Sequence, residues 1–286
     1  MNYKGIYINL DRSTERRAAL DDNLALYNLK QRYKRLRAAD GNEEKISSSL
    51  QNANEIGCFL SHVWALREGL NSGHHVHIIE DDTIFASATE RTLEWAITSG
   101  IIDNYDLLYT DITLPLSNDT YRKFKTLFDR AVTRDDSGAI KNVKFQALDL
   151  RDIPFAAASS YLVNKNSAQK LRRIYDDEMG AGIRSPIDAF FRTQAQSGAL
   201  KVGCLFPFIT SVKVEETLTS TVYTSPDSTK KLLAANIGRY SFFVGCDWDE
   251  CDMFINTHLT QPTETDRHAQ ALTKLLAFSL MDDIPR

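Results

Sequence analysis

The sequence has little of several features that mark specialised classes of protein. Its four cysteines are scattered over 286 residues, which excludes a disulfide scaffold and favours reduced thiols in the cytosol. Its 34 basic and 38 acidic residues give a net charge of −4, which excludes a nucleic-acid binder dominated by positive charge. The longest uncharged apolar run, residues 154–163, has about half the length of a membrane-spanning helix. The first residues lack the apolar segment and cleavage site of a signal peptide, so we expect a cytoplasmic protein.

Two further absences narrow the architecture and the chemistry. No Gly-x-Ser-x-Gly segment is present, which excludes the nucleophile elbow of an α/β-hydrolase, and no internal repeat occurs. The composition that remains is typical of a folded protein, with 43% hydrophobic and 25% charged residues. The chain can therefore bury a substantial core, in one large domain or two ordinary ones.

Strand-like and helix-like segments alternate along the first 110 residues. β-Branched and aromatic runs indicate strands, and apolar residues at helical spacing indicate helices. Ser13 is the expected N-cap of the first helix, which carries Leu20, Leu24 and Tyr27 on one face. The alternation predicts an α/β fold with a mostly parallel central sheet flanked by helices. The expected strands cover residues 5–10, 33–38, 75–79 and 106–110, and the expected helices cover residues 14–27, 56–73 and 89–99.

The second half of the chain is less regular. Residues 111–150 are polar and charged, which predicts a long excursion that includes a hairpin. The pattern then predicts strands at 155–163 and 201–206, and helices at 167–176, 186–196, 228–237 and 264–281.

Two polar clusters follow strands of the predicted sheet. Residues 9–12 come after the first strand, and Glu80-Asp81-Asp82 comes directly after residues 75–79. Ligands of open α/β sheets bind at the carboxyl ends of the strands, where such clusters meet. Alternation along an extended chain puts Glu80 and Asp82 on one face and Asp81 on the other. Hard oxygen ligands at this spacing suit Mg²⁺ or Mn²⁺ bridging a diphosphate. A solvated acidic turn is the alternative interpretation.

The clusters belong to a series of ordered motifs. Residues 6–17 (IYINLDRSTERR), 37–41 (RAADG), 55–62 (EIGCFLSH) and 78–82 (IIEDD) resemble the corresponding segments of glycosyltransferase family 25, the lipooligosaccharide-type galactosyltransferases. Residues 160–171 and Ser185-Pro186-Ile187-Asp188 are similar to later motifs of that family. No resemblance extends beyond about residue 225.

The resemblance implies a GT-A-type nucleotide-sugar-binding fold, and the two helices predicted at 228–237 and 264–281 add a C-terminal helical extension to it. Residues 1–225 would form the catalytic domain, with a nucleotide-sugar half at about 1–110 and an acceptor half at about 111–225. Residues 226–286 would form a mainly helical extension packed on the same domain. The activity implied is metal-dependent, inverting transfer of a hexose, with galactose as the first candidate, from a UDP-sugar to a hydroxyl of a saccharide or glycolipid such as lipooligosaccharide. The alternative is a non-catalytic glycosyltransferase-like module for binding or assembly.

The resemblance, together with the needs of the reaction, also assigns roles to residues. Asp188 is the candidate general base, and a helix-capping carboxylate is its alternative reading. Asp82 is expected to hold Mn²⁺ or Mg²⁺ with help from Glu80 or Asp81. His258 is the candidate late histidine of the metal shell, with a plain surface histidine as the alternative. The residues expected to bind the nucleotide-sugar are Asn9, Leu10, Arg12, Arg17, Glu80 and Asp81, although a solvated helix face explains Arg17 as well.

Several other residues leave alternatives open. Gly57 on a predicted helix indicates close approach to a strand or ligand, and His62 either faces the site or is a satisfied buried histidine. Cys246 and Cys251 fit no standard zinc spacing. Departures from the family at Ser159 and Ala189 put the acceptor in doubt. Five bases favour either peripheral contact with an anionic inner membrane surface or a solvated face: Lys30, Arg32, Lys34, Arg35 and Arg37.

Overall fold

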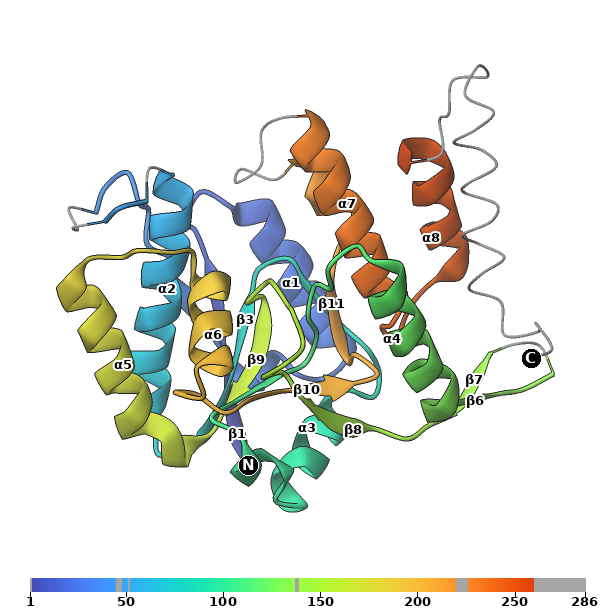
Figure 1. The fold of residues 1–286 in the computed structure, drawn as a ribbon, viewed down its shortest axis with the longest axis horizontal. Coiled ribbons are helices and arrows are strands. Elements are labelled where there is room, and N and C mark those ends of the chain that lie inside the picture. Colours follow the sequence, from blue (N-terminus) through green and yellow to red (C-terminus); the bar gives the residue numbers. More distant parts are fainter. Residues whose placement is uncertain (1, 45–47, 51, 137–138, 220–225, 260–286) are drawn as a thin grey trace.

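A seven-stranded sheet lies at the centre of the molecule, with helices packed on both faces (Figure 1). The computed structural model describes residues 2–44, 48–50, 52–136, 139–219 and 226–259. The α/β class expected from the alternation of segments is confirmed. In order across the sheet, the strands are β2 (Tyr33–Arg37), β1 (Tyr3–Asn9), β3 (His75–Glu80), β9 (Ser160–Val163), β5 (Leu107–Tyr109), β10 (Val202–Phe206) and β8 (Gln146–Asp149).

The sheet is mostly parallel, but two strands run against the others. Strands β2, β1, β3, β5 and β10 share one direction, whereas β9 and β8 are antiparallel to their neighbours. The chain leaves the carboxyl end of β5 and returns to the same end, where the Thr110 amide donates to the Ser160 carbonyl (3.2 Å). Strand β9 therefore starts at the edge where β3 and β5 end, and must run back between them.

The two faces of the sheet bury two separate apolar clusters. Helices α1 (Thr14–Leu26) and α3 (Thr89–Thr98) cover one face. Helices α2 (Ala53–Leu70), α5 (Ala168–Ala181) and α6 (Ile187–Gln196) cover the other. Consecutive residues of β3 divide between the clusters, since Ile78 packs on the α2 side and Ile79 on the α1 side. Burial on both faces explains why these strands read as continuous apolar runs in the sequence.

The polar stretch 111–150 contains more regular structure than its composition indicates. The expected hairpin is present as β6 (Val132–Arg134) and β7 (Ile140–Val143). The sequence reading missed helix α4 (Asn118–Ala131), whose buried Phe124 and Phe128 pack edge-on against Phe206. These two aromatic residues are one helical turn apart, but the charged residues around them obscured the pattern.

The strand expected at 155–163 is shorter than predicted, because β9 starts only at Ser160. Ala157 has a φ of 70°, a left-handed conformation that interrupts extended pairing. The remaining strands, β4 (Thr83–Phe85) and β11 (Thr210–Val212), form a small antiparallel pair. Because β4 directly follows Asp82, this pair fixes the end of the acidic motif. The short 3₁₀ turns are η1 (Lys30–Arg32), η2 (Ile101–Asn104), η3 (Lys165–Ser167) and η4 (Glu215–Thr219).

The C-terminal part of the described chain packs on the same core. Helix α7 (Pro226–Tyr240) contacts β11 and η4, and its Leu233 and Ile237 join the cluster on the α2 side. Helix α8 (Trp248–Phe254) and the π-helical turn η5 (Ile255–Leu259) follow. The helix expected at 228–237 is confirmed within α7, and the one expected at 264–281 lies outside the described residues. Among the described helices, none combines the length and apolar character needed to cross a membrane.

Candidate functional site

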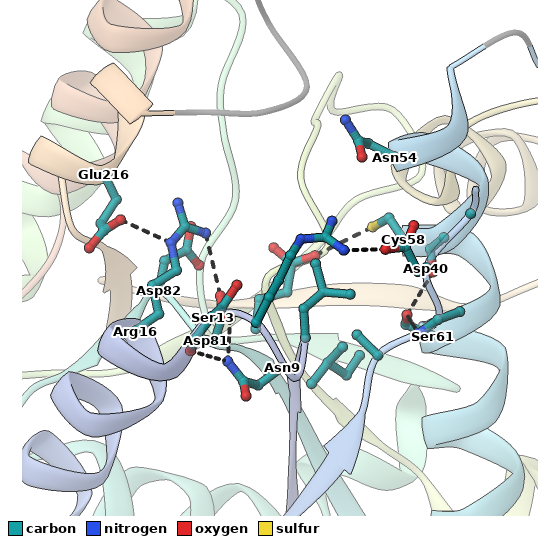
Figure 2. Close-up of a pocket in the computed structure, with 18 of the residues that line it drawn as sticks. Asn9, Ser13, Arg16, Asp40, Asn54, Cys58, Ser61, Asp81, Asp82 and Glu216 are labelled. Carbon is teal, nitrogen blue, oxygen red and sulfur yellow. Dashed lines mark hydrogen bonds and ion pairs between the residues drawn. The ribbon is translucent and has the colours of Figure 1, made fainter. Parts of the chain in front are cut away.

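A cavity of about 730 Å³ opens at the carboxyl edge of the sheet (Figure 2). Its walls come from the segment after β1, the start of α1, the segment after β2, helix α2 and the end of β3. The two polar clusters identified in the sequence therefore meet, as the strand order requires. The predicted residues that line this first cavity are Asn9, Leu10, Arg12, Glu80, Asp81 and Asp82.

Asn9 braces the floor of the first cavity. It is buried, and its Nδ2 donates to Asp81 Oδ2 (2.8 Å) and to the Ser13 carbonyl (3.0 Å). Its Oδ1 accepts from Arg35 Nε (3.0 Å). The predicted nucleotide-binding Asn9 thus lines the cavity, but its polar atoms already hold β1, the start of α1 and the acidic motif together.

Two glycines allow the segment after β2 to pack directly on α2. A Cβ on Gly57 would lie 2.7 Å from the Ala39 carbonyl oxygen, and one on Gly41 would lie 1.8 Å from the Ala53 carbonyl oxygen. Both positions therefore exclude any side chain. Ser61 secures the same contact, because its hydroxyl accepts from the Ala39 amide (2.8 Å). The close approach inferred from Gly57 is thus to backbone, and it shapes one wall of the first cavity.

Arg16, and not Arg17, is the helix α1 arginine that faces the site. Arg16 Nε lies 3.0 Å from Glu216 Oε2, and its Nη1 lies 3.5 Å from Asp81 Oδ1 (Figure 2). Arg17 lines neither this cavity nor the one described below. Helical spacing was the available signal, since Ser13 and Arg16 are three residues apart and share a face. Arg12 lies at the rim, exposed and paired with Asp40.

The three carboxylates of the acidic motif have different surroundings. Burial raises the pKa of Asp81, although Asn9 and Arg16 donate hydrogen bonds to it. Burial, together with the charges of Glu80 and Asp81, raises the pKa of Asp82 to about 7. Asp82 Oδ1 is buried and accepts no hydrogen bond from the described residues. Asp82 therefore has a buried oxygen left for a ligand.

Glu80 is held by two residues of helix α2. Its Oε1 lies 3.1 Å from His62 Nε2 and 3.5 Å from Cys58 Sγ. Burial disfavours the charged carboxylate, but the interactions with His62, the hydrogen bond from Cys58 and the charge of Arg239 together outweigh burial and keep the pKa of Glu80 below its usual value. His62 is both a satisfied buried residue and part of the cavity wall, so the two readings of it in the sequence are compatible.

A second cavity of about 320 Å³ adjoins the first. Glu80 and Asp82 line both cavities, whereas Asp81 lines only the first, as the predicted alternation of faces requires. Asp188 lines the second cavity near the start of α6. The other residues shared by both cavities are Arg16, Cys58 and Glu216.

Asp188 is not the N-cap of its helix, because Pro186 occupies that position. Its Oδ2 accepts from the Ala157 amide (3.3 Å), and its Oδ1 accepts from the Ala189 amide (2.8 Å). The left-handed backbone of Ala157 thus supplies one of the two donors that orient the carboxylate toward its position in the wall. Asp188 is half-buried, so an oxygen of this carboxylate can reach a ligand in the cavity.

Arg239 of helix α7 is a site residue that the sequence did not reveal. It is buried, lines the second cavity, and its Nη2 lies 2.6 Å from Asp111 Oδ2. Arg239 also donates a hydrogen bond to the hydroxyl of Ser159, the residue at which the sequence departs from the family pattern. Asp111 itself lines neither cavity. No local pattern announces Arg239, because its partners are 80 or more residues away.

His258 is not brought to the site. It lies in η5, where its ring stacks on Phe254 at a centroid distance of 6.1 Å, and it lines neither cavity. Figure 1 shows α8, which precedes this turn, on the opposite side of the molecule from α2. The expected contribution of His258 to a metal shell therefore has no support in the arrangement of the described residues.

The five bases between Lys30 and Arg37 all have acidic partners. The pairs are Lys30 with Asp21, Arg32 with Glu90 and Glu94, Lys34 with Glu68, Arg35 with Asp11, and Arg37 with Asp11 and Glu43. This local neutralisation favours a solvated face over a surface that attracts anionic lipid.

Comparison with known proteins is consistent with this geometry. A family model described as "Glycosyltransferase family 25 (LPS biosynthesis protein)" matches residues 3–190. This range holds most of the first cavity and Asp188 of the second. A search of curated proteins found no match. The match covers more than half of the chain, so the chain belongs to glycosyltransferase family 25 and is a glycosyltransferase of the lipopolysaccharide-biosynthesis type.

Proposed function

We propose that this glycosyltransferase moves a hexose, with galactose as the first candidate, from a UDP-sugar to a saccharide hydroxyl with inversion at the anomeric carbon. The observation that carries the proposal is the shared wall of two adjoining cavities. Glu80 and Asp82 face both cavities, and Asp188 faces the smaller one. Transfer requires a donor and an acceptor to meet at one charged point, and the shared wall supplies that point.

The first cavity is the proposed donor site of a GT-A-type fold. Its volume of about 730 Å³ lies within the range of small-molecule and cofactor sites. Leu10 and Ala38 offer apolar surface for a base, and Arg12 and Arg16 offer positive charge for a diphosphate. We therefore assign the donor contacts to residues at the carboxyl ends of β1, β2 and β3.

The acidic motif fits a divalent cation. Asp82 has a buried oxygen without a hydrogen-bond donor among the described residues, and Glu80 lies on the same wall. An uncompensated buried carboxylate is costly, and a cation removes that cost. We propose that Asp82 holds Mn²⁺ or Mg²⁺ with Glu80 as helper. When bound, the ion supplies positive charge to the diphosphate leaving group.

Asp188 is the proposed general base. Its carboxylate is oriented by the Ala157 and Ala189 amides and faces the smaller cavity, which is the proposed acceptor site. It would take the proton of the acceptor hydroxyl while that oxygen attacks the anomeric carbon. Four residues that lie beyond the family-matched range, Lys213, Thr217, Asn236 and Arg239, also line this cavity, so the C-terminal part of the chain contributes to acceptor choice.

The acceptor that we propose is a saccharide or glycolipid such as lipooligosaccharide, and the proposed location is the cytoplasm. The scattered, sparse cysteines support a reducing compartment. Peripheral contact with the inner membrane surface would have to use a surface other than the five paired bases.

A donor panel tests the proposed function. The full chain is incubated with a set of UDP-hexoses and other nucleotide-sugars, with and without a saccharide acceptor, and nucleotide release is measured with Mn²⁺ or with excess chelator. We expect acceptor-dependent release from one UDP-hexose, strongest with UDP-galactose, and loss of both release and tight UDP binding in chelator. UDP binding without release from any donor would instead indicate a non-catalytic module, and equal UDP binding in chelator would contradict the metal assignment.

A further inference from the structure

Three potential metal ligands of different chemistry converge at the shared wall of the two cavities. Cys58 and His62 are four residues apart on α2, so they lie on the same helix face, and Glu80 ends the neighbouring strand β3. Their ligand atoms all lie within 4.8 Å of one another. Cys58 and Glu80 line both cavities and His62 lines the first, so small solutes can reach the cluster.

The spacing of these atoms fits a tetrahedral cation. Zinc lies about 2.3 Å from sulfur and about 2.0–2.1 Å from nitrogen or oxygen ligands. A tetrahedral angle then separates sulfur from oxygen by about 3.5 Å and nitrogen from oxygen by about 3.3 Å. The observed separations are 3.5 Å for Cys58 Sγ to Glu80 Oε1 and 3.1 Å for His62 Nε2 to Glu80 Oε1. Hydrogen bonds therefore already hold these ligand pairs at the spacing a cation requires.

The ligand types select the class of cation. A thiolate, an imidazole and a carboxylate suit Zn²⁺ and similar thiophilic ions, whereas Mg²⁺ and Mn²⁺ prefer an all-oxygen set such as the one at Asp82. Three protein ligands leave a fourth position for water, as in open zinc sites. Burial and the charge of Glu80 raise the pKa of the Cys58 thiol, so binding must release the thiol proton to solvent. A cation bound at His62 Nε2 requires the imidazole proton to sit on Nδ1, so any proton that Nε2 shares with Glu80 in the empty site must also leave.

The outer partners of the cluster also match those of a metal site. His62 Nδ1 lies 2.9 Å from the Tyr161 hydroxyl, and the two rings stack at a centroid distance of 5.7 Å. Metal-bound histidines commonly donate their second ring N–H to a neighbouring acceptor, which fixes the ring orientation. The Tyr161 hydroxyl can accept this hydrogen bond from His62 Nδ1, which orients the ring with Nε2 directed at Glu80.

We propose that Cys58, His62 and Glu80 form a binding site for one thiophilic divalent cation of the Zn²⁺ class, which shares Glu80 with the hard-cation site at Asp82 but takes its sulfur and nitrogen ligands from α2. The site does not depend on the proposed transferase chemistry. Its consequence for that chemistry is inhibition, because a cation there engages Glu80 and occupies the wall between donor and acceptor. A thiophilic ion should therefore lower the transfer rate even at saturating Mn²⁺.

Cobalt(II) is the direct probe, because a cobalt–thiolate bond gives a charge-transfer absorption that an all-oxygen site does not. The full-length protein is titrated anaerobically with Co²⁺, and Zn²⁺ is then added in competition. We expect a thiolate band that saturates at one equivalent and is abolished by Zn²⁺. Cys58→Ser should remove the band, and Tyr161→Phe should weaken the affinity by about 10–100-fold without removing it.

Cys246→Ser is the matched control, since Cys246 is also partly buried but lines neither cavity. Cys246→Ser should leave the band intact. Asp82→Asn should also leave it intact, because this change removes a ligand of the hard-cation site but none of Cys58, His62 and Glu80. Circular dichroism confirms folding of each variant, and His62→Gln provides a second ligand deletion should Cys58→Ser not fold. Absence of a thiolate band in the native protein would show that Cys58 and His62 only support Glu80 by hydrogen bonds. A band that survives Cys58→Ser, or that disappears in Cys246→Ser, would also overturn the proposal.

Discussion

The pKa of a buried aspartate is shifted in opposite directions at the two edges of the central sheet. At the amino edge, Asp106 precedes β5 and accepts from Ser167 Oγ (2.5 Å), Lys170 Nζ (2.5 Å) and the Lys201 amide (2.7 Å). Burial disfavours its charged form, but these donors outweigh burial and lower its pKa. At the carboxyl edge, burial and neighbouring charges raise the pKa of Asp82 to about 7, and one of its oxygens has no donor among the described residues.

This difference separates stability from function. A carboxylate with three donors contributes to the free energy of unfolding, whereas one packed beside Glu80 and Asp81 reduces it. The fold tolerates the unfavourable aspartate at the edge where ligands bind, where a cation can compensate it. The same substitution at the two edges should therefore have opposite effects.

The largest effect is expected from Asp82→Asn on transfer. The amide removes the negative charge that holds the proposed cation, so turnover should be abolished while the far-ultraviolet circular dichroism stays unchanged. Steady-state nucleotide release at saturating Mn²⁺ is the measurement. Asp106→Asn is the matched control and should keep its turnover per folded molecule. Near-native rates in Asp82→Asn would remove Asp82 from the metal site.

Asp188→Asn should lower kcat by about 10²–10⁴-fold, which is the usual contribution of general-base catalysis. The amide keeps the shape of the side chain and one acceptor oxygen, so the donor KM and UDP affinity should change little. Donor and acceptor kinetics are measured separately to show this split. An unchanged kcat would mean that Asp188 only orders the start of α6.

Arg239→Met should lower the free energy of unfolding by about 3–5 kcal/mol, because it leaves Asp111 buried and unpaired. The double variant with Asp111→Leu removes both charges and should recover most of the loss. Urea denaturation of the single and double variants measures the difference. Equal stabilities of the native protein and Arg239→Met would show that α7 does not depend on this ion pair.

Asp106→Asn should cost about 1.5–3 kcal/mol of stability at pH 7, the range for hydrogen bonds to a charged group. A lowered pKa in the folded state adds stability that is present above the usual aspartate pKa of about 3.9 and is lost as pH falls through the folded value. The gap between native protein and variant should therefore be constant near neutrality and shrink below about pH 4. Urea denaturation from pH 7 to pH 3 tests this, and a gap independent of pH would contradict it.

The smallest effect has the opposite sign. In excess chelator, Asp82→Asn should be more stable than the native protein by on the order of 1 kcal/mol at pH 8, because the cost of burying an unpaired amide offsets most of the roughly 4 kcal/mol that the pKa shift implies. A raised folded pKa adds stability below the usual pKa of about 3.9, and this is lost as pH rises through about 7. The advantage of the neutral amide should thus grow between about pH 4 and pH 8. A variant less stable than the native protein at pH 8 would contradict the uncompensated charge at Asp82.

The sequence by itself determined the alternating α/β order, the position of most strands and helices, and the meeting of residues 9–12 with the acidic motif. These features are local: apolar periodicity sets each element, and strands of one direction bring their ends to one edge. Gly57 likewise indicated a close approach, and the structure shows that it is to backbone at Ala39.

Only the tertiary structure decided the features that depend on distant partners. Three such features follow from packing between separate segments: the reversal of β9, the buried pair of Arg239 and Asp111, and the placement of His258 outside both cavities. Helix α4 was not predicted from the sequence, because its position depends on two buried phenylalanines among many exposed charged residues. The physical reason is the same in each case. Local sequence sets the backbone preference of a segment, but burial and charge pairing depend on which distant segments pack against it.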